Sequence, residues 1–422
     1  MHKFEKYSSY KESGVEWLGV IPEHWEVIKL GYFFRAKKGI NAAKLTKEFC
    51  GKVQGNYNVY SGQTENNGVM DNIDFFEFDY EKEGCLFTTT VGAKAMTLKY
   101  LQEKFSLSQN CMIMFSSKNV IDIKFFYYHL QPLFLYERKF IPDHMQASFR
   151  MEDFYQFKSA LPPKEEQTKI ASFLDKKTSQ IDKAISQKEK LIELLKERRQ
   201  ITINEAVTKG LDKDVEFKDS GVEWIGEIPK HWEVFPGLRV FSENKRKNAG
   251  MIDDRVLSLS YGRIIRKPKE KLVGLVPESF ETYQIVKVGD IIIRCTDLQN
   301  DKVSLRTALA KNDGIITSAY LNLNVKNGSS EYWHYLLHVL DITKAIYKLG
   351  SGLRQNLSFN DFKRLDIVLP PKEEQIQIVE YIETQTAKID KAIELQQNYI
   401  AKLKEYKASL IDSVVTGKVR VD

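Results

Sequence analysis

The sequence predicts an α+β protein with two globular α/β domains and two long helices that pair as an antiparallel, intramolecular coiled coil. Two repeats predict this fold. The stretch SGVEWLGVIPEHWEV at residues 13–27 returns as SGVEWIGEIPKHWEV at 220–234, with twelve of fifteen letters identical. The stretch LPPKEEQ occurs at 161–167 and again at 369–375. An offset of 207 to 208 residues is far longer than a solenoid unit, so it indicates two domains joined by similar connectors.

Seven segments follow from this repeat. They are a first bracket segment (1–27), a first variable domain (28–160), a first helix segment (161–209), a second bracket segment (210–234), a second variable domain (235–368), a second helix segment (369–416) and a tail (417–422). The variable domains have nearly equal lengths but share little sequence. We expect the first bracket to lie beside the end of the second helix, which gives a circular pseudo-twofold arrangement.

The variable domains have the same predicted order of elements. Short runs rich in β-branched or aromatic residues predict strands, and longer amphipathic runs predict helices. We expect strands at 84–92, 110–117, 289–297 and 319–325, and helices at 121–140 and 331–349. Pro132 should kink or divide the first of these helices. We therefore expect one fold with two different surfaces.

Each LPPKEEQ stretch predicts the start of a long helix. Pro163 and Pro371 suit the first helical position, and about 45 residues without Pro or Gly follow each of them. Apolar residues then recur at spacings of 7, 4 or 3, which is close to a coiled-coil seam. The predicted helix-pair interface is Leu174, Ile181, Ile185, Ile192, Leu195, Ile382, Ile389, Ile393, Ile400, Leu403, Leu410 and Val414. The alternative is a helix that lies across a globular core.

Composition limits the functional classes. No apolar run approaches the roughly 20 residues of a membrane span, and the first residues have no apolar signal region. The four cysteines include no CxxC pair, so neither a zinc site nor a disulfide framework is indicated. We expect a cytoplasmic protein with no membrane partner.

Positive charge is concentrated in the variable domains. Residues 28–160 contain 17 Lys and Arg against 14 Asp and Glu, a net of +3. Residues 235–368 contain 21 against 14, a net of +7, while the whole chain is +6. This distribution fits a polyanionic partner such as nucleic acid. An ordinary solvated surface explains the charge equally well.

Taken together, these motifs resemble the specificity subunit of type I restriction-modification systems. The resemblance rests on the doubled bracket stretches, both LPPKEEQ helix starts, and IDKAI at 181–185 and 389–393. It implies that residues 28–160 and 235–368 are target recognition domains that each read one half of a bipartite DNA site. It also implies that the helices set the spacer and dock the modification subunits.

The resemblance also implies the partners. They are double-stranded DNA, two methyltransferase subunits and, in the full complex, restriction/translocase subunits. The chain itself would be a non-catalytic part of a restriction endonuclease and adenine methyltransferase complex. It would hold no cofactor or metal, because S-adenosylmethionine, ATP and Mg²⁺ would bind the partner subunits. The sequence contains no GxxxxGK[ST] phosphate loop.

Candidate DNA contacts are cationic residues in the variable domains, because Lys and Arg bind phosphates and Arg reads guanine. They are Arg35, Lys37, Lys38, Lys94, Arg150, Arg263, Arg266, Lys267, Lys269, Arg294, Arg306 and Arg354. The alternative for each is a solvated surface side chain. The acidic run from Asp71 to Glu83 should face away from DNA.

The bracket segments are expected to seat the domains on the helix ends. Trp17, Trp25, Trp224 and Trp232 should be buried anchors whose indole N–H groups are hydrogen-bonded. His24 and His231 have no evident metal or catalytic partners in the sequence, so we expect packed, hydrogen-bonded histidines. Two other functions stay open: a coiled-coil scaffold that binds proteins without reading DNA, and a fused methyltransferase or nuclease with unrecognised motifs.

Overall fold

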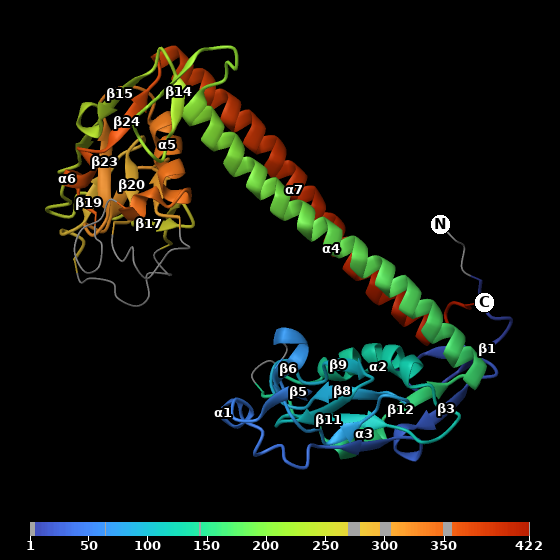
Figure 1. Ribbon diagram of the computed structural model, residues 1–422. Helices are drawn as coiled ribbons and strands as arrows, with labels where there is room; N and C mark the ends of the chain where they lie inside the picture. Colours follow the sequence, from blue (N-terminus) through green and yellow to red (C-terminus); the bar gives the residue numbers. More distant parts are fainter. Residues whose placement is uncertain are drawn as a thin grey trace. The chain divides into compact units, whose positions relative to one another are not determined.

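Two long helices dominate the computed structural model (Figure 1). The first, α4, spans Lys164–Lys209 (46 residues), and the second, α7, spans Lys372–Val415 (44 residues). The structure describes residues 5–63, 65–142, 145–268, 279–295, 305–348 and 357–421. The chain divides into two units: unit 1 holds residues 1–189 and 397–422, and unit 2 holds residues 190–396. Each long helix therefore contributes one half to each unit.

The halves of α4 and α7 pair within each unit. In unit 1, Nζ of Lys407 lies 2.7 Å from the carboxylate of Asp182, and Nζ of Lys188 lies 4.6 Å from the ring centre of Tyr399. In unit 2, Arg199 lies 3.3 Å from Asp390. Lower numbers on one helix meet higher numbers on the other, so the pairing is antiparallel.

The residues of the expected seam are buried or half-buried. Those buried are Leu174, Ile181, Ile185, Ile192, Ile382, Ile389, Leu410 and Val414, and those half-buried are Leu195, Ile393, Ile400 and Leu403. The same helices expose Lys, Glu and Gln over the rest of their surfaces, which is the pattern that a paired amphipathic helix requires.

Unit 1 contains twelve strands and three shorter α-helices among its described residues. These are β1 (Tyr10–Glu12), β2 (Val20–Pro22), β3 (Glu26–Lys29), β4 (Arg35–Lys37), α1 (Lys47–Cys50), β5 (Gln54–Tyr60), β6 (Val69–Ile73), β7 (Phe78–Asp79), β8 (Cys85–Thr89), β9 (Leu98–Leu101), β10 (Lys104–Leu107), β11 (Cys111–Phe115), α2 (Ile123–Arg138), α3 (Met151–Gln156) and β12 (Lys158–Leu161).

Two four-stranded sheets form the variable domain of unit 1. The helix-covered sheet has the order β4-β11-β8-β9, and the second sheet has the order β6-β5-β10-β7. Side chains alternate across β11: Met112 and Met114 join the core that includes α2, whereas Ile113 joins the core that includes Phe105 of the second sheet. Because alternate strand residues point to opposite faces, the helix-covered sheet packs against α2 on one face and against the second sheet on the other.

Unit 2 contains the corresponding elements. They are β13 (Phe217–Asp219), β14 (Glu227–Pro229), β15 (Glu233–Pro236), β16 (Phe241–Glu243), β17 (Leu257–Ser260), β18 (Arg263–Arg266), β19 (Gln284–Val286), β20 (Ile291–Ile293), β21 (Thr307–Leu309), β22 (Gly314–Ile316), β23 (Leu321–Val325), α5 (Ser330–Ile342), α6 (Phe359–Phe362) and β24 (Asp366–Leu369).

The strand order of unit 2 matches that of unit 1. Its helix-covered sheet is β16-β23-β20-β21, the counterpart of β4-β11-β8-β9. Four of its other strands form the pairs β17-β18 and β19-β22, and a parallel bridge between Val256 and Ile315 connects the two pairs. The parallel pairing of β5 with β10 is the unit 1 counterpart of that bridge. The predicted fold class, with the same α/β domain twice and an antiparallel helix pair, is confirmed.

The predicted strands and helices are found with small differences. The helix α2 continues through Pro132, which therefore does not divide it. The predicted helix 331–349 ends earlier, because α5 stops at Ile342 and a separate 3-10 turn covers Ala345–Lys348. Across the part of the chain that the structure describes, none of the helices combines the length and apolarity that membrane crossing would require.

Candidate nucleic-acid interface

Both bracket segments pack against the end of a long helix in the same way. In unit 1, Gly417 follows α7 with φ +74°, and a Cβ there would lie 2.3 Å from Pro22 and 3.2 Å from the ring of Trp25. In unit 2, Gly210 follows α4 with φ +74°, and a Cβ there would lie 3.1 Å from the ring of Trp232. Each tryptophan is fully buried. A left-handed backbone and a close indole ring both explain why glycine ends each helix.

Each bracket segment also pairs with the strand that leads into a long helix. Strand β3 pairs with β12 in antiparallel register, with Glu26 opposite Leu161. Strand β15 pairs with β24, with Glu233 opposite Leu369. The HWEV and LPPKEEQ stretches are therefore repeated together because they are partners in space. This pairing holds each variable domain between its bracket and its helix.

A glutamate in the first turn of each long helix binds the bracket histidine. Nε2 of His24 lies 2.9 Å from Oε2 of Glu166, and Nε2 of His231 lies 2.6 Å from Oε1 of Glu374. Trp232 also donates its indole N–H to the other oxygen of Glu374, at 2.8 Å. Both histidines are about half exposed. The predicted hydrogen-bonded histidines are found, although they are less buried than expected.

The glutamine that follows each of these glutamates orients the helix that covers the sheet. Oε1 of the buried Gln167 accepts from the backbone N–H of Asp122, the N-cap of α2, at 2.8 Å. Oε1 of the buried Gln375 accepts from Ser329 N–H, at the N-cap of α5, at 3.0 Å. Each amide also donates to the carbonyl of Pro162 or Pro370. Sequence reasoning missed these residues, although their repetition in KEEQ was the available signal.

The tryptophan prediction holds only in part. Trp25 and Trp232 are fully buried, whereas Trp17 and Trp224 are half-buried. Trp17 donates its N–H to the carbonyl of Lys158 at 3.2 Å, and Trp232 donates to Glu374. The indole nitrogens of Trp25 and Trp224 have no hydrogen-bond partner among the described residues. The expectation of four buried and bonded anchors is therefore wrong for three of the four.

In unit 1, the five candidate DNA contacts are all exposed but lie on different elements. Arg35 and Lys37 lie on the edge strand β4, and Lys38 follows it. Lys94 lies in the connection between β8 and β9, and Arg150 is the N-cap of α3. The chain near Arg150 runs beside the connection that carries Lys94, because Phe149 N–H donates to the Thr90 carbonyl and Gly92 N–H to the Ala147 carbonyl.

Lys37 lies close to residues of the acidic run. Its Nζ sits 5.0 Å from the ring centre of Phe115, and both residues line a cavity of about 960 Å³. Glu77, Asp79 and Glu83 line the same cavity. The expected separation between cationic and acidic residues therefore does not extend to Lys37, whose surroundings are of mixed charge.

In unit 2, three candidate contacts are gathered on one hairpin. Arg263 and Arg266 lie on β18, and Lys267 follows it. All three side chains are exposed. Within the described part of the chain, none of the three pairs with a carboxylate. Lys269 and Arg354 lie outside the described residues.

The prediction that Arg306 contacts DNA is wrong, because the residue is buried. Its side chain is 0% exposed, so it is not available to a phosphate or a base edge. The guanidinium lies 3.3 Å from the carbonyl of Arg294 and 3.4 Å from the hydroxyl of Tyr347. It packs over the Tyr347 ring at 5.6 Å from the centre. Arg294 itself is half-buried. A basic residue in the sequence does not reveal whether the fold uses it in the core.

A second basic feature of unit 2 was not among the sequence candidates. Lys245, Arg246 and Lys247 line a cavity of about 430 Å³ beside Asn322 and Gln284. Arg246 forms an ion pair with the buried Asp290. The Nδ2 groups of Asn322 and Asn324 also donate to Asp290, at 3.3 Å and 2.6 Å. The run KRK was the available signal in the sequence.

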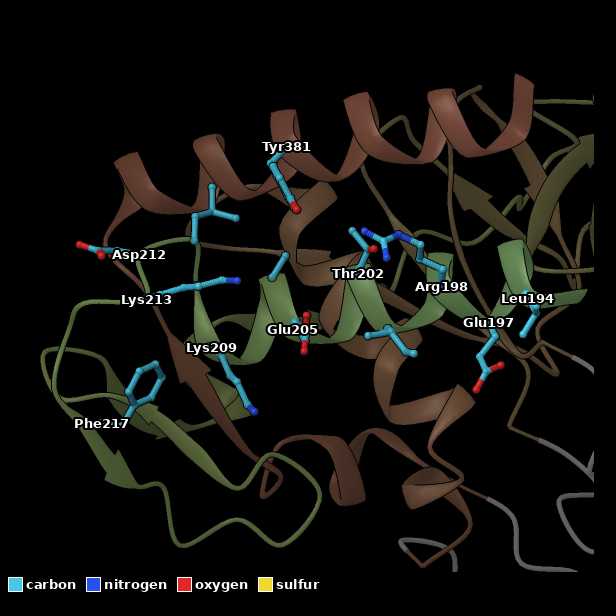
Figure 2. Close-up of a pocket in the computed structure, with 14 residues that line it drawn as sticks. Leu194, Glu197, Arg198, Thr202, Glu205, Lys209, Asp212, Lys213, Phe217 and Tyr381 are labelled. Carbon is cyan, nitrogen blue, oxygen red and sulfur yellow. The ribbon is translucent and has the colours of Figure 1, made fainter. Parts of the chain in front are cut away.

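The helix pair of unit 2 carries an exposed groove of about 710 Å³ with a mixed apolar and charged lining. Figure 2 shows α4 side chains from Leu194 to Lys209 along this groove, with Tyr381 of α7 and Phe217 contributed by other segments. Leu194 is 51% exposed and Ile201 48%. Arg198, Glu197 and Glu205 give its surface both signs of charge.

Comparison with known proteins identifies the family. The type I restriction modification DNA specificity domain matches residues 22–194 and 239–405. The MjaVIII specificity subunit of a type I restriction enzyme from Methanocaldococcus jannaschii is 24% identical and aligns over 99% of this chain and 98% of its own. The putative MjaX specificity subunit of the same organism is also 24% identical, with the same two coverages.

A solved structure has the same fold. A chain from a study of complex assembly and conformational transition in a type I R-M system has a TM-score of 0.67 at 12% identity, covering 94% of this chain and 98% of that chain. At this identity the likeness concerns the fold alone. The two matched segments of sequence, however, cover most of the 422 residues. The chain therefore belongs to the family of type I restriction-modification DNA specificity subunits.

Proposed function

We propose that each unit reads one half of a bipartite DNA sequence. One observation carries this proposal. The two variable domains have the same order of strands, but their surface side chains differ. Corresponding bracket and helix contacts position both domains, while the exposed residues differ. Two equal scaffolds with unequal surfaces suit the recognition of two different short sequences.

The cations support DNA as the ligand. Lys38, Lys94 and Arg150 in unit 1 and Arg263, Arg266 and Lys267 in unit 2 are exposed. Phosphate contacts position a protein on DNA, and contacts to base edges provide the sequence preference. Lys38, Lys94 and Arg150 extend over several elements, whereas the unit 2 cations share one hairpin. Each of the two long helices has residues in both units, and the pair would set the spacer between the half-sites.

The groove on the unit 2 helix pair is our candidate docking surface for a methyltransferase subunit. Leu194, Ile201 and Tyr381 expose apolar surface in this groove, among charged side chains such as Glu197 and Arg198. An amphipathic helix from the partner would cover these side chains. Two methyltransferase subunits, and restriction/translocase subunits in the full complex, complete the assembly that we propose.

A charge-introducing substitution tests the docking surface. Leu194→Asp should reduce co-purification with the methyltransferase subunit at least tenfold while the chain keeps its thermal stability. Leu395→Asp is the matched control, because Leu395 is also 51% exposed on the helix pair but does not line the groove. Equal capture by both variants would exclude the groove as the docking surface.

Methyl transfer, ATP hydrolysis and DNA cleavage would belong to the partner subunits. S-adenosylmethionine, ATP and Mg²⁺ would bind there, and this chain would contribute sequence choice alone. Family membership supports this division, as does the lack of a GxxxxGK[ST] phosphate loop in the sequence. Purified chain that transferred a labelled methyl group to DNA without its partners would contradict it.

Methylome sequencing of a host that carries the chain and its modification subunit tests DNA reading. We expect modified adenines within a two-part sequence. Exchange of residues 235–368 for the domain of a relative should alter one half of that sequence and leave the other unchanged. A modified sequence without a gap, or one that changes in both halves, would contradict the proposal.

The scaffold alternative predicts a different salt response. Phosphate contacts make the logarithm of the affinity fall linearly with the logarithm of the salt concentration, by roughly 0.9 per phosphate contacted. A DNA-reading complex should show a steep slope in a filter-binding or anisotropy titration. A scaffold without DNA contacts would add nothing to the slope of the methyltransferase subunits alone.

A further inference from the structure

We propose that the β17–β18 hairpin of unit 2 enters the major groove of double-stranded DNA, with Tyr261 at its tip in contact with the bases and Arg263 directed at a base edge. This inference rests on the proposed DNA-reading function and names the element and the residues that perform it in unit 2.

One face of the hairpin packs into an apolar core, and the residues of the opposite face are half-buried or exposed. Leu257 and Ile264 pack into a core with Val286, Ile292 and Ile316. Strand residues alternate between faces, so Ser258, Ser260, Arg263 and Ile265 lie on the opposite face. On that face Arg263 is exposed and Ile265 is 46% exposed. The fold thus holds one side of the ribbon firmly and presents the other to solvent.

Tyr261 is the least expected residue of the hairpin. Its side chain is 90% exposed, and its backbone takes φ +48°. Gly262 follows with φ +72°, so the two residues form a two-residue turn in which both φ angles are positive. Asn, Asp or Gly is favoured at the first of these positions, because a bulky side chain is strained there. Folding alone gives no reason to place an exposed aromatic ring on a strained backbone.

The turn is held in place from below. A Cβ at Gly262 would lie 3.0 Å from the side chain of Leu305, so the glycine allows this side chain to pack directly under the tip. Lys267 N–H donates to the carbonyl of Val256 and fixes the open end of the hairpin. These contacts hold the tip of the hairpin in place, and a residue that contacts a ligand needs such support.

The corresponding hairpin of unit 1 shows that the fold does not require an aromatic tip. Strands β5 and β6 occupy the same places in the strand order as β17 and β18. Their connection is longer and carries Asn66 and Asn67, both exposed and both with positive φ. Asparagine is the residue type that such backbone angles favour. The tyrosine at the unit 2 tip is thus a feature of this surface and not of the scaffold.

Charge and shape identify the ligand as double-stranded DNA. Arg263 adjoins the turn that carries the ring, and Arg266 and Lys267 lie farther along the same strand towards the open end of the hairpin. All three are exposed and have no carboxylate partner in the described part of the chain. A two-stranded ribbon fits the major groove, where Arg binds the O6 and N7 atoms of guanine. Aromatic side chains add contact area with bases and with the methyl group of thymine.

The test uses the complete complex of this chain with its modification subunits. Tyr261→Asn removes the ring and places a residue at the turn that its backbone angles favour, so the hairpin should remain folded. We expect a roughly tenfold weaker affinity for a duplex that carries the modified two-part sequence. The methylome should lose stringency in the half read by unit 2 alone. Tyr261→Phe keeps the ring and should bind within about twofold of the unaltered complex.

Arg263→Gln provides an independent readout. It should weaken binding by roughly 10- to 100-fold and relax the choice of base at one position of the same half-site. Met251→Asn is the matched control, because Met251 also has positive φ and is 44% exposed but lies outside the hairpin. It should change neither the affinity nor the modified sequence.

The outcomes separate this inference from the proposed function. If the unaltered complex shows no two-part sequence, the proposed function itself fails. If it shows one, and Tyr261→Asn and Arg263→Gln leave both affinity and sequence unchanged, only the hairpin assignment is overturned. A change confined to the half read by unit 1 would overturn it as well.

Discussion

Nδ1 of His129 lies 2.8 Å from the carbonyl oxygen of Val415, although 286 residues separate the two in sequence. His129 belongs to the helix that covers the unit 1 sheet, and Val415 ends α7. The ring is fully buried between Trp17 and Phe125, at 5.2 Å and 5.1 Å between ring centres. This contact fastens the first variable domain to the end of the second long helix.

Unit 1 should lose stability in mild acid because of this histidine. Burial lowers the pKa of His129 to about 4, below the value near 6.5 of an unfolded histidine. The neutral ring donates one N–H to Val415, and Nε2 has no partner among the described residues, so protonation would bury a second, unbonded N–H. The stabilisation is complete above pH 6.5 and is lost as the pH falls towards 4, by up to roughly 3 kcal/mol. Chemical denaturation between pH 4 and 7 measures it.

His129→Gln is the comparison for that measurement. Glutamine keeps a donor for the Val415 carbonyl but does not titrate, so the slope of unfolding free energy against pH should decrease in this range. An unchanged slope would mean that other groups cause the acid sensitivity.

Glu374 should matter more for stability than its neighbour Glu373. Glu374→Gln weakens the contacts to His231 and Trp232, and we expect a loss of about 1–2 kcal/mol in the free energy of unfolding. Glu373→Gln removes the same charge from the same helix turn, but its side chain is exposed. Thermal unfolding of both variants separates the bracket contact from the helix-dipole effect, and equal losses would show that the contact contributes nothing.

Gln375→Ala should be strongly destabilising. It leaves the Ser329 N–H and the Pro370 carbonyl without their partner and creates a small cavity in a buried site. We expect a loss of about 2–4 kcal/mol, measured by urea unfolding. Gln377→Ala, on the exposed face of the same helix, should remain within about 0.5 kcal/mol of the parent chain. A mild effect at Gln375 would contradict its assigned role in orienting α5.

Arg306 and Arg263 should respond in opposite ways. Arg306→Met removes a buried guanidinium from the Tyr347 ring and the Arg294 carbonyl, and should cost about 3 kcal/mol or more of stability. Arg263→Ala removes an exposed cation and should leave stability within about 0.5 kcal/mol while DNA affinity falls. Unfolding and DNA-binding titrations on both variants check this contrast. A stable Arg306→Met variant with weakened DNA binding would restore Arg306 to the interface.

The sequence by itself determined the organisation of this protein. Repetition identified the bracket segments, the helix starts and the doubled domain, because repeats are visible without any knowledge of contacts. The spacing of Ile181, Ile185 and their counterparts determined the long helices, because a 3.5-residue rhythm is a local property of the chain. Strand positions such as those of β8 and β11 also followed from local patterns.

Only the tertiary structure decided which of these residues meet. Glu166 and Gln167 are adjacent in sequence, yet one binds the bracket and the other caps α2, since neighbouring positions on a helix point in different directions. Burial separated Arg306 from Arg263, which the sequence presents as equivalent cations. Such distinctions depend on contacts between residues far apart in the chain, and residue type and periodicity do not determine those contacts.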